Sequence, residues 1–461
     1  MVKDDVFVNL HFPDAPSIKV VPPGPKAKEL LDLQVKVDSK AVIYPLSCPT
    51  AWESAKGATL RDVDGNVYID LFAGVGVVNV GHQNPFVLEA LKTQASKLIH
   101  SLDFPTEKRL KMIQKLIEIA PGNLKNNSKV FFCSPAGTDA VESALKLARS
   151  FNKRPGIIAF EGGYHGQTFG AVSVTSKRGF RTGMPTGLPV SRVPYAYCYR
   201  CPLGKEYPEC EMGCIDFIER LFKDPESGLV DIGAMIVEAI QGESGIVIPP
   251  DEFLQGLRRI CDENSVVLIV DEIQAGFGRT GKMWACQHPG VTPDIMTMSK
   301  ALGGIGLPNA GIIYRKDLDV WAPAAYVGTF RGNVLSCACG LAGIEYMESN
   351  NVVEYSESLG REVLRRLKDL EKDSKIIGEV RGRGLMLGIE FVEDKKTKKP
   401  FTEGVAKIQR KCFERGIMIW KGGHWANVIR FLPPLVITRE LMGKALTVFE
   451  EEVKEVERSA L

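Results

Sequence analysis

The stretch VVLIVDEIQAGFGRTG, residues 266–281, decides how this chain folds, because a run of five apolar residues ends abruptly at Asp271. A second apolar run starts at Ile295 and ends at Ser299-Lys300, with glycines close behind. Short apolar runs of this kind are typical of buried strands in a parallel sheet. Ligands of open α/β sheets bind beyond the carboxyl ends of the strands, so Asp271 and Lys300 are candidates to face one ligand. By spacing alone, an ordinary strand-end acid and a solvated lysine remain the simpler interpretation.

Helix-like and strand-like segments alternate around this stretch from about residue 85 onward. Helical periodicity marks residues 85–98, 107–119, 138–151 and 251–264, and apolar strands are expected at 129–132, 156–160, 234–238 and 266–271. This alternation predicts an α/β domain built around a mostly parallel sheet.

The two ends of the chain follow a different pattern. Residues 1–40 hold five prolines and are expected to form an extended arm that leads into a short helix. The turn-rich residues 62–66 join two β-rich stretches, 58–61 and 67–71, which predicts a hairpin. Beyond residue 340, a long charged helix at 348–375 and glycine-punctuated strands near 382–390 indicate a second, smaller α+β domain.

The expected organisation is therefore one large domain and one small, discontinuous domain. Residues 1–75 supply an N-terminal arm and part of the small domain, residues 76–340 form the large domain, and residues 341–461 form the C-terminal small domain.

Composition excludes several classes of partner. The 461 residues hold 58 Lys plus Arg against 56 Asp plus Glu, so the net charge of +2 gives no basic footprint for nucleic acid or an anionic membrane. Hydrophobic residues at 44% and charged residues at 25% are ordinary for globular proteins. No apolar run approaches the roughly 20 residues that span a bilayer, and the N-terminus lacks a signal-peptide core. We therefore expect a cytoplasmic protein that binds neither nucleic acid nor membrane.

Four cysteines crowd into one segment, in the spacing C-x2-C-x8-C-x3-C. They are Cys198, Cys201, Cys210 and Cys214. Two short pairs suggest zinc, but the stretch between the pairs is shorter than in usual zinc sites. A structural crosslink or metal, and reduced thiols in an insertion loop, both remain open.

Several motifs, taken in chain order, resemble the class III aminotransferases. These motifs are AGTDA at 136–140, YHG at 164–166, EAIQGE at 238–243, DEIQAGFGRTG at 271–281, Ser299-Lys300, GTF at 328–330 and NVIRFLPPL at 427–435. The resemblance covers roughly residues 40–455. It implies fold type I of the pyridoxal 5'-phosphate (PLP) enzymes, with residues 76–340 as the PLP-binding domain.

The resemblance also implies roles for the residues that would hold the PLP ring. Lys300 matches the lysine that forms a Schiff base with the cofactor aldehyde. Asp271 matches the carboxylate that pairs with the pyridine nitrogen, so these two residues form the expected catalytic pair. Gln274 would bond the ring hydroxyl, Tyr164 would stack on the ring, and Glu238 belongs to the same cofactor-binding set.

Phosphate binding is expected at the start of the helix after residue 136. Gly137 and Thr138 open that helix, where free backbone N–H groups and the helix dipole favour an anion. Ala136 stands where the family usually has serine, which removes one side-chain contact. Thr329 matches a threonine that reaches the phosphate from a neighbouring subunit, so the resemblance implies a homodimer with shared active sites.

Substrate recognition is where the match is looser. Arg430 corresponds to an arginine that binds a substrate carboxylate, and Glu243 to a glutamate that neutralises this arginine when an uncharged end must enter. Gln167 stands where related enzymes commonly carry an arginine. Asp103 is a candidate to hold a second ammonium group, although a helix-capping or solvated aspartate is the simpler interpretation.

The implied activity is transfer of an amino group from an amino acid to a 2-oxo acid such as 2-oxoglutarate. The donor would be an ω-amino or diamino acid, for example 4-aminobutyrate or ornithine, and no metal is expected to take part. A PLP-dependent amino-acid racemase or epimerase of the same family fits the same residues and stays open as an alternative.

Overall fold

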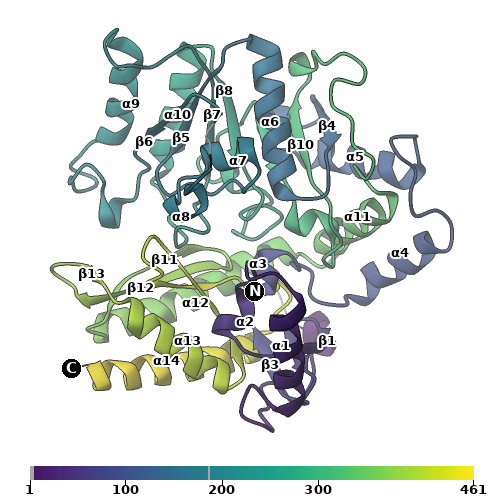
Figure 1. Cartoon of the computed structure of the whole chain (residues 1–461), viewed down its shortest axis with the longest axis vertical. Coiled ribbons are helices and arrows are strands. Elements are labelled where there is room, and N and C mark those ends of the chain that lie inside the picture. Colours follow the sequence, from purple (N-terminus) through teal and green to yellow (C-terminus); the bar gives the residue numbers. More distant parts are fainter. Residues whose placement is uncertain (1–4, 185–186, 461) are drawn as a thin grey trace.

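The structure is a computed structural model that describes residues 5–184 and 187–460. The chain forms a large lobe, above in Figure 1, and a small lobe that contains the C-terminal helix. Among the described residues, no helix is both long and apolar enough to cross a membrane.

One seven-stranded sheet organises the large lobe, in the order β4-β10-β9-β8-β7-β5-β6. Its strands are β4 (Ser128–Phe132), β5 (Gly156–Phe160), β6 (Val190–Val193), β7 (Ile232–Glu238), β8 (Val267–Asp271), β9 (Ile295–Met298) and β10 (Gly311–Arg315). The neighbours from β9 to β6 pair in parallel, and only β10 runs antiparallel to both of its neighbours. The predicted α/β domain with a mostly parallel sheet is confirmed.

Helices cover both faces of this sheet, so its central strands are buried on both sides. Alternate residues of β8 belong to two different cores, with Leu268 in one and Ile269 in the other. The helix α6 (Gly137–Asn152) packs on one face, and α10 (Asp251–Glu263) packs on the other beside α9 (Gly213–Lys223). Three further helices of this lobe are α5 (Glu107–Glu118), α7 (Phe169–Val174) and α8 (Arg178–Arg181).

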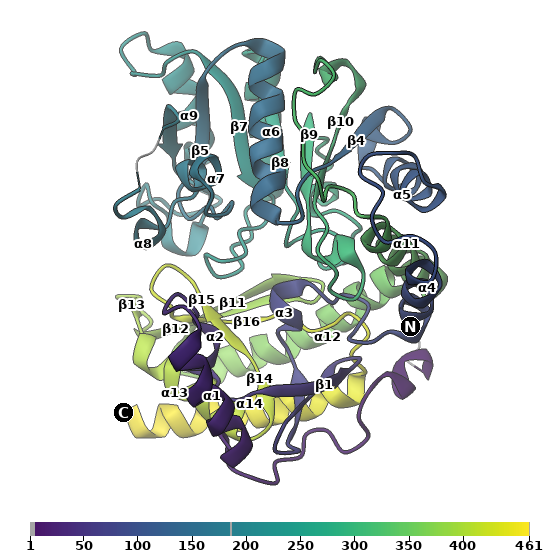
Figure 2. The same cartoon turned by 45° about the vertical axis from the view of Figure 1, so that its right-hand side comes forward.

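The small lobe combines two sheets from opposite ends of the chain (Figure 2). One contains β1 (Trp52–Lys56), β2 (Thr59–Asp62), β3 (Val67–Asp70) and β14 (Ile417–Met418), and the other contains β11 (Ile377–Arg383), β12 (Met386–Asp394), β15 (Trp420–Gly422) and β16 (Val428–Phe431). The short β13 (Lys399–Pro400) pairs with β12. Because β14 pairs in parallel with β3, the N-terminal hairpin and the C-terminal chain share one sheet.

The helices of the small lobe come from both ends of the chain. They are α1 (Pro25–Val37), α2 (Tyr44–Ser47), α3 (Ala73–Gly76), α12 (Val352–Asp373), α13 (Thr402–Glu414) and α14 (Arg439–Ala460). Phe7 of the N-terminal arm packs in the same core as Tyr355 of α12. The smaller, discontinuous α+β unit expected from the sequence is therefore present, while the domain limits at residues 75 and 340 stay predictions.

Two helices connect the lobes, and one of them departs from the sequence prediction. They are α4 (Pro85–Ala95) and α11 (Val334–Ser349), which pack against each other. The helix predicted at 348–375 begins only at Val352, because α11 occupies the preceding residues and Asn351 turns the chain with a φ of 49°. The sequence pattern missed α11 because the helix is buried nearly all round and shows no polar stripe.

Candidate active site

A cavity of about 340 Å³ opens at the carboxyl ends of β7, β8 and β9. It is lined by Ala136, Gly137, Thr138, Tyr164, His165, Gly166, Gln167, Glu238, Glu243, Asp271, Ile273, Gln274, Ser299 and Lys300. Parallel strands end at the same edge of a sheet, which brings together residues that are far apart in sequence. The volume lies within the range of small-molecule sites.

Lys300 follows β9 and begins a short 3-10 turn, with a left-handed φ of 45°. Burial lowers the pKa of its amine to about 8, an effect that the carboxylate of Glu243 opposes and the guanidinium of Arg430 reinforces. A fraction of this amine is therefore neutral, and hence nucleophilic, near neutral pH.

Asp271 closes β8 and is only 4% exposed. One carboxylate oxygen accepts hydrogen bonds from the Thr297 hydroxyl at 2.9 Å and the Ile273 amide at 3.0 Å. The other lies 2.8 Å from Nδ1 of His165, whose Nε2 is buried without a hydrogen-bond partner among the described residues. These contacts fix the orientation of the carboxylate at the floor of the cavity.

Glu238 and Gln274 form another side of the cavity. The Glu238 carboxylate accepts bonds from the Tyr164 and Gly242 amides, both at 2.9 Å, and burial raises its pKa to about 7. Gln274 donates to Glu243 at 3.4 Å, while its Oε1 is buried without a partner among the described residues. A buried acceptor left open in this way suits a ligand that brings a donor.

The N-terminus of α6 points its first residues, Gly137 and Thr138, into the cavity. The Thr138 hydroxyl lies 2.7 Å from the Thr168 hydroxyl, which precedes α7. Gly166 has a φ of +117°, and a Cβ there would come within 2.5 Å of the Thr138 hydroxyl. A glycine is therefore required for this close approach to a helix end that favours anions.

Arg430 and Glu243 meet at the border of the cavity. Nη1 of Arg430, which is only 1% exposed, donates to Glu243 at 2.7 Å and to the Gly242 carbonyl at 3.3 Å. Burial alone would raise the pKa of Glu243, but the Arg430 guanidinium outweighs it and holds that pKa at about 2. Glu243 lines the cavity directly, and Arg430 stands behind it.

Three residues singled out in the sequence do not line the cavity of their own chain: Arg430, which stands behind Glu243, and Thr329 and Asp103. Thr329 is exposed, and the Asp103 carboxylate forms an ion pair with Arg331. Conversely, sequence reasoning assigned no role to His165 or Thr297, both of which hold Asp271. His165 was within reach because it sits inside the YHG motif, whereas nothing in the sequence marks Thr297.

The four clustered cysteines line a separate cavity of only about 20 Å³. All four are free thiols, and burial raises the pKa of Cys198 to about 11. Within residues 5–184 and 187–460, no group of three or more side chains is arranged to hold a metal ion.

Comparison with known proteins gives a consistent result. A family model for class-III aminotransferases matches residues 45–453. The diaminobutyrate–2-oxoglutarate aminotransferase of Rhizobium meliloti is 40% identical over 417 residues, which cover 88% of each chain. The alanine/serine racemase of Pyrococcus horikoshii is 37% identical over 453 residues, covering 95% of this chain and 93% of the racemase.

A similar solved structure is described with PLP at its active site. The ornithine aminotransferase of Toxoplasma gondii, with partial occupancy of PLP at its active site, matches with a TM-score of 0.82 and 27% identity. The match covers 94% of this chain and 95% of that chain. Together with the family match over residues 45–453, these relatives show that the chain belongs to the class III aminotransferases, a family of PLP-dependent enzymes.

Proposed function

We propose that this enzyme transfers an amino group from an ω-amino or diamino acid to 2-oxoglutarate. The observation that carries the proposal is the 2.7 Å pair of Arg430 and Glu243 beside Lys300. A relative named for diaminobutyrate and 2-oxoglutarate, 40% identical, supports this choice of substrates, with 4-aminobutyrate and ornithine as further candidates. A cytoplasmic location for the enzyme stays a prediction.

The residues of the cavity fit PLP. Lys300 offers a partly neutral amine for the cofactor aldehyde, and Asp271 offers an oriented carboxylate for the pyridine nitrogen. The open Oε1 of Gln274 suits the ring hydroxyl, and the α6 terminus at Gly137 and Thr138 suits the phosphate. Tyr164 and Glu238 complete the proposed set.

The chemistry divides between the cofactor and the chain. When bound, PLP supplies an electron sink for the charge left on the substrate carbon that loses its proton. Lys300 would take that proton onto its Nζ and pass it to the aldehyde-derived carbon of the cofactor, not back to the substrate carbon, a task that suits an amine with a pKa of about 8. Asp271 would keep the ring nitrogen protonated, and His165 and Thr297 hold the Asp271 carboxylate in place.

Arg430 and Glu243 let one site accept two kinds of substrate. When 2-oxoglutarate binds, its carboxylate replaces Glu243 as the partner of Arg430. A guanidinium can bind that carboxylate through two parallel hydrogen bonds. When the ω-amino end of a donor enters, Glu243 stays paired and cancels the positive charge of Arg430. The pair thus admits an acidic end in one half-reaction and an uncharged or amino end in the other.

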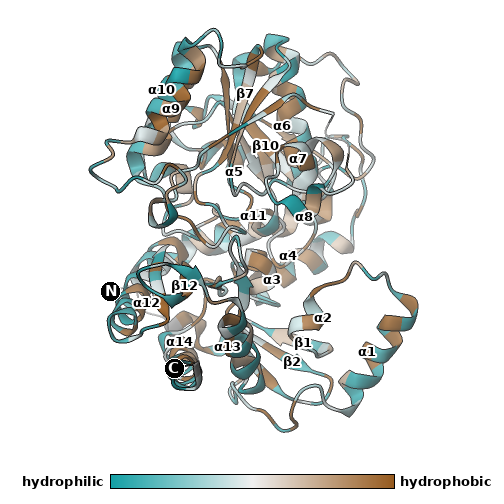
Figure 3. Cartoon of the chain, turned by 60° about the vertical axis from the view of Figure 1, so that its left-hand side comes forward, coloured by the Kyte–Doolittle hydropathy of each residue, from teal (hydrophilic) through white to brown (hydrophobic). Residues whose placement is uncertain are grey.

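We also infer a homodimer with shared active sites. Thr329 is exposed and absent from the cavity of its own chain, which fits a residue that completes the phosphate site of a second subunit. An apolar groove of about 1050 Å³ runs beside α1, where Leu33 and Val37 are 52% and 75% exposed. Figure 3 shows α1 standing apart from the rest of the small lobe. Light scattering should give twice the chain mass of 50.7 kDa.

The activity is tested by incubating the PLP-loaded enzyme with single amino acids, with and without 2-oxoglutarate. We expect glutamate to form only when a diamino or ω-amino donor and 2-oxoglutarate are both present. The second candidate function, racemisation, is favoured by the relative named alanine/serine racemase. Loss of optical activity without any keto acid or glutamate would select the racemase and exclude the transaminase.

If the donor is a diamino acid, we expect Asp103 to bind its second ammonium group. Its carboxylate is exposed and pairs with Arg331, on a loop that we place near the partner subunit's site. Asp103→Ala should raise the KM for ornithine about tenfold, the cost of one charge-assisted bond, and leave the KM for 4-aminobutyrate nearly unchanged. Equal changes in the two KM values, measured side by side, would assign Asp103 to loop structure instead.

The lowered pKa of Lys300 predicts how cofactor loading depends on pH. The neutral amine becomes more abundant as pH rises through about 8, so covalent capture of PLP by the cofactor-free protein should accelerate and then level off. An ordinary lysine would keep accelerating to about pH 10. Stopped-flow absorbance at several pH values measures the rate, and a midpoint near that of an ordinary lysine would contradict the effect of burial.

A further inference from the structure

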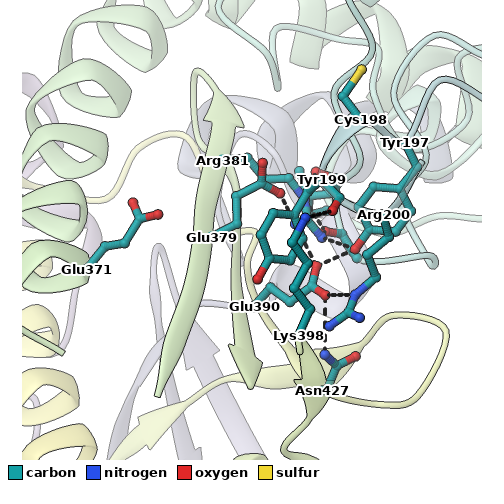
Figure 4. A network of polar contacts seen from close by, with 12 residues as sticks. Tyr197, Cys198, Tyr199, Arg200, Glu371, Glu379, Arg381, Glu390, Lys398 and Asn427 are labelled. Carbon is teal, nitrogen blue, oxygen red and sulfur yellow. Dashed lines mark hydrogen bonds and ion pairs between the residues drawn. The ribbon is translucent and has the colours of Figure 1, made fainter. Parts of the chain in front are cut away.

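A buried carboxylate, Glu390 on β12, collects polar groups from both lobes (Figure 4). It is fully buried and accepts bonds from Arg381 at 2.7 Å and Asn427 at 3.4 Å. Tyr197 and Arg200, from the segment of the large lobe that carries Cys198, also donate hydrogen bonds to Glu390. A buried carboxylate is tolerated when it is paired in this way, so these contacts fix the junction of the two lobes.

Arg381 on β11 uses its remaining donors in a different direction. Its Nη2 donates to the Gly245 carbonyl at 2.7 Å, and its Nε donates to the Ile246 carbonyl at 2.9 Å. One guanidinium, only 8% exposed, therefore holds Glu390 and the loop after β7 at the same time. The planar fork of arginine permits this double reach, which the point charge of a lysine does not.

The loop held by Arg381 is the one that carries Glu243. Glu243 precedes Gly245 by two residues, and the backbone carbonyl of Glu243 accepts a hydrogen bond from the Gly423 amide at 2.9 Å. Gly245 has a φ of +104°, and a Cβ there would come within 2.8 Å of Val428. The loop thus packs its bare backbone against β16, and its position depends on hydrogen bonds to its carbonyl groups.

The strand register links the same guanidinium to Arg430. In the pairing of β12 with β16, Glu390 lies opposite Val428 and Gly388 lies opposite Arg430. Arg381 is therefore bonded to the partner strand of Arg430 on one side and to the loop of Glu243 on the other.

We propose that Arg381 is a positioning residue that sets the geometry of the Glu243–Arg430 pair and thereby the affinity of the site for carboxylate substrates. This inference rests on the proposed function, in which Arg430 receives the acidic end of 2-oxoglutarate. Arg381 does not line the cavity; it reaches the loop of Glu243 through backbone carbonyls and the strand beside Arg430 through the Glu390 carboxylate. Without the hydrogen bonds of Arg381, the Glu243 loop and the strand that pairs with β16 can move independently. The Arg430 guanidinium then no longer has a fixed orientation.

The test compares three variants of the PLP-loaded full chain. Arg381→Lys keeps the charge but cannot hold both segments, and Tyr197→Phe removes one hydroxyl from the network while keeping its ring. Arg383→Gln is the matched control, because Arg383 lies on the same strand but its hydrogen bond goes to Asp251 at 2.7 Å, and not to the carbonyls of Gly245 and Ile246 that Arg381 holds. The probe is glutarate, a dicarboxylate that cannot react, and its Kd is measured by calorimetry.

We expect Arg381→Lys to weaken glutarate binding about tenfold and Tyr197→Phe about threefold, as for other residues that act through a network. Arg383→Gln should bind glutarate as the wild type does. Hydrogen exchange of residues 239–247 should quicken in Arg381→Lys and stay unchanged in the control. In steady-state assays, KM for 2-oxoglutarate should rise while kcat changes little.

The inference is overturned if Arg381→Lys and Arg383→Gln change the Kd for glutarate equally, or if the wild type binds no glutarate. The proposed function fails separately, if no amino donor yields glutamate with the wild type. Binding and exchange need no turnover, so they decide the role of Arg381 in either case.

Discussion

Lys300→Ala should lower the rate of transamination by about a thousandfold or more, because in the proposed mechanism one amine both binds the cofactor covalently and moves the proton. The amine has no substitute among the residues that line the cavity, where Lys300 is the single lysine described. The variant should also lose the PLP that borohydride reduction attaches to the wild-type chain. Intact-mass spectrometry after reduction measures that attachment directly.

Lys282→Ala provides the control for this change. Lys282 is exposed, lies between β8 and β9, and does not line the cavity. The control should keep both turnover and attached cofactor. Cofactor attached to Lys300→Ala at wild-type stoichiometry would place the reactive amine elsewhere.

Asp271→Asn should lower kcat by about a hundredfold to a thousandfold, the range found when one preorganised electrostatic contact is removed. Asparagine keeps the size of the side chain and its bonds to Thr297 and Ile273, but it carries no charge to hold the ring nitrogen protonated. PLP should still bind, so the loss is expected in kcat and not in cofactor content. Single-turnover kinetics at saturating donor measures the effect.

Glu272→Gln is the matched control for Asp271→Asn. Glu272 is the next residue, equally buried, but its carboxylate accepts from the Ala285 and Cys286 amides outside the cavity. Burial raises its pKa to about 7, so its neutral form is already accessible. We expect the kcat of Glu272→Gln to stay within a few-fold of the wild-type value. A similar loss in both variants would show that Asp271 acts on the fold and not on the reaction.

Much of the site could be predicted because it follows from sheet geometry. The apolar run before Asp271 marked β8, and the rule that ligands bind beyond the ends of parallel strands made Asp271 and Lys300 candidates to face one ligand, but only the motif resemblance gave them roles. The motif resemblance then added Glu238 and Gln274, which lie on the same cavity. Local sequence was enough for these predictions because each residue lies at the last position of a recognisable strand or within three residues after it.

Other parts depend on contacts between distant segments, which no local pattern records. Tyr197 and Glu390 are 193 residues apart, and their bond arises only when the two lobes meet. The helix α11 escaped prediction because it is buried nearly all round and lacks an amphipathic stripe. Thr329 and Asp103 gain a proposed role only beside a second chain, so neither the sequence pattern nor one folded chain explains them.

Transfer of the amino group itself is the most direct measure of what this enzyme does. The purified PLP enzyme is mixed with 2,4-diaminobutyrate, labelled with heavy nitrogen at its terminal amino group, and with unlabelled 2-oxoglutarate. Mass spectrometry should find one labelled glutamate for each donor consumed, and none with Lys300→Ala. Glutamate that carries no label, or a donor that is racemised while the label stays on it, would contradict the account.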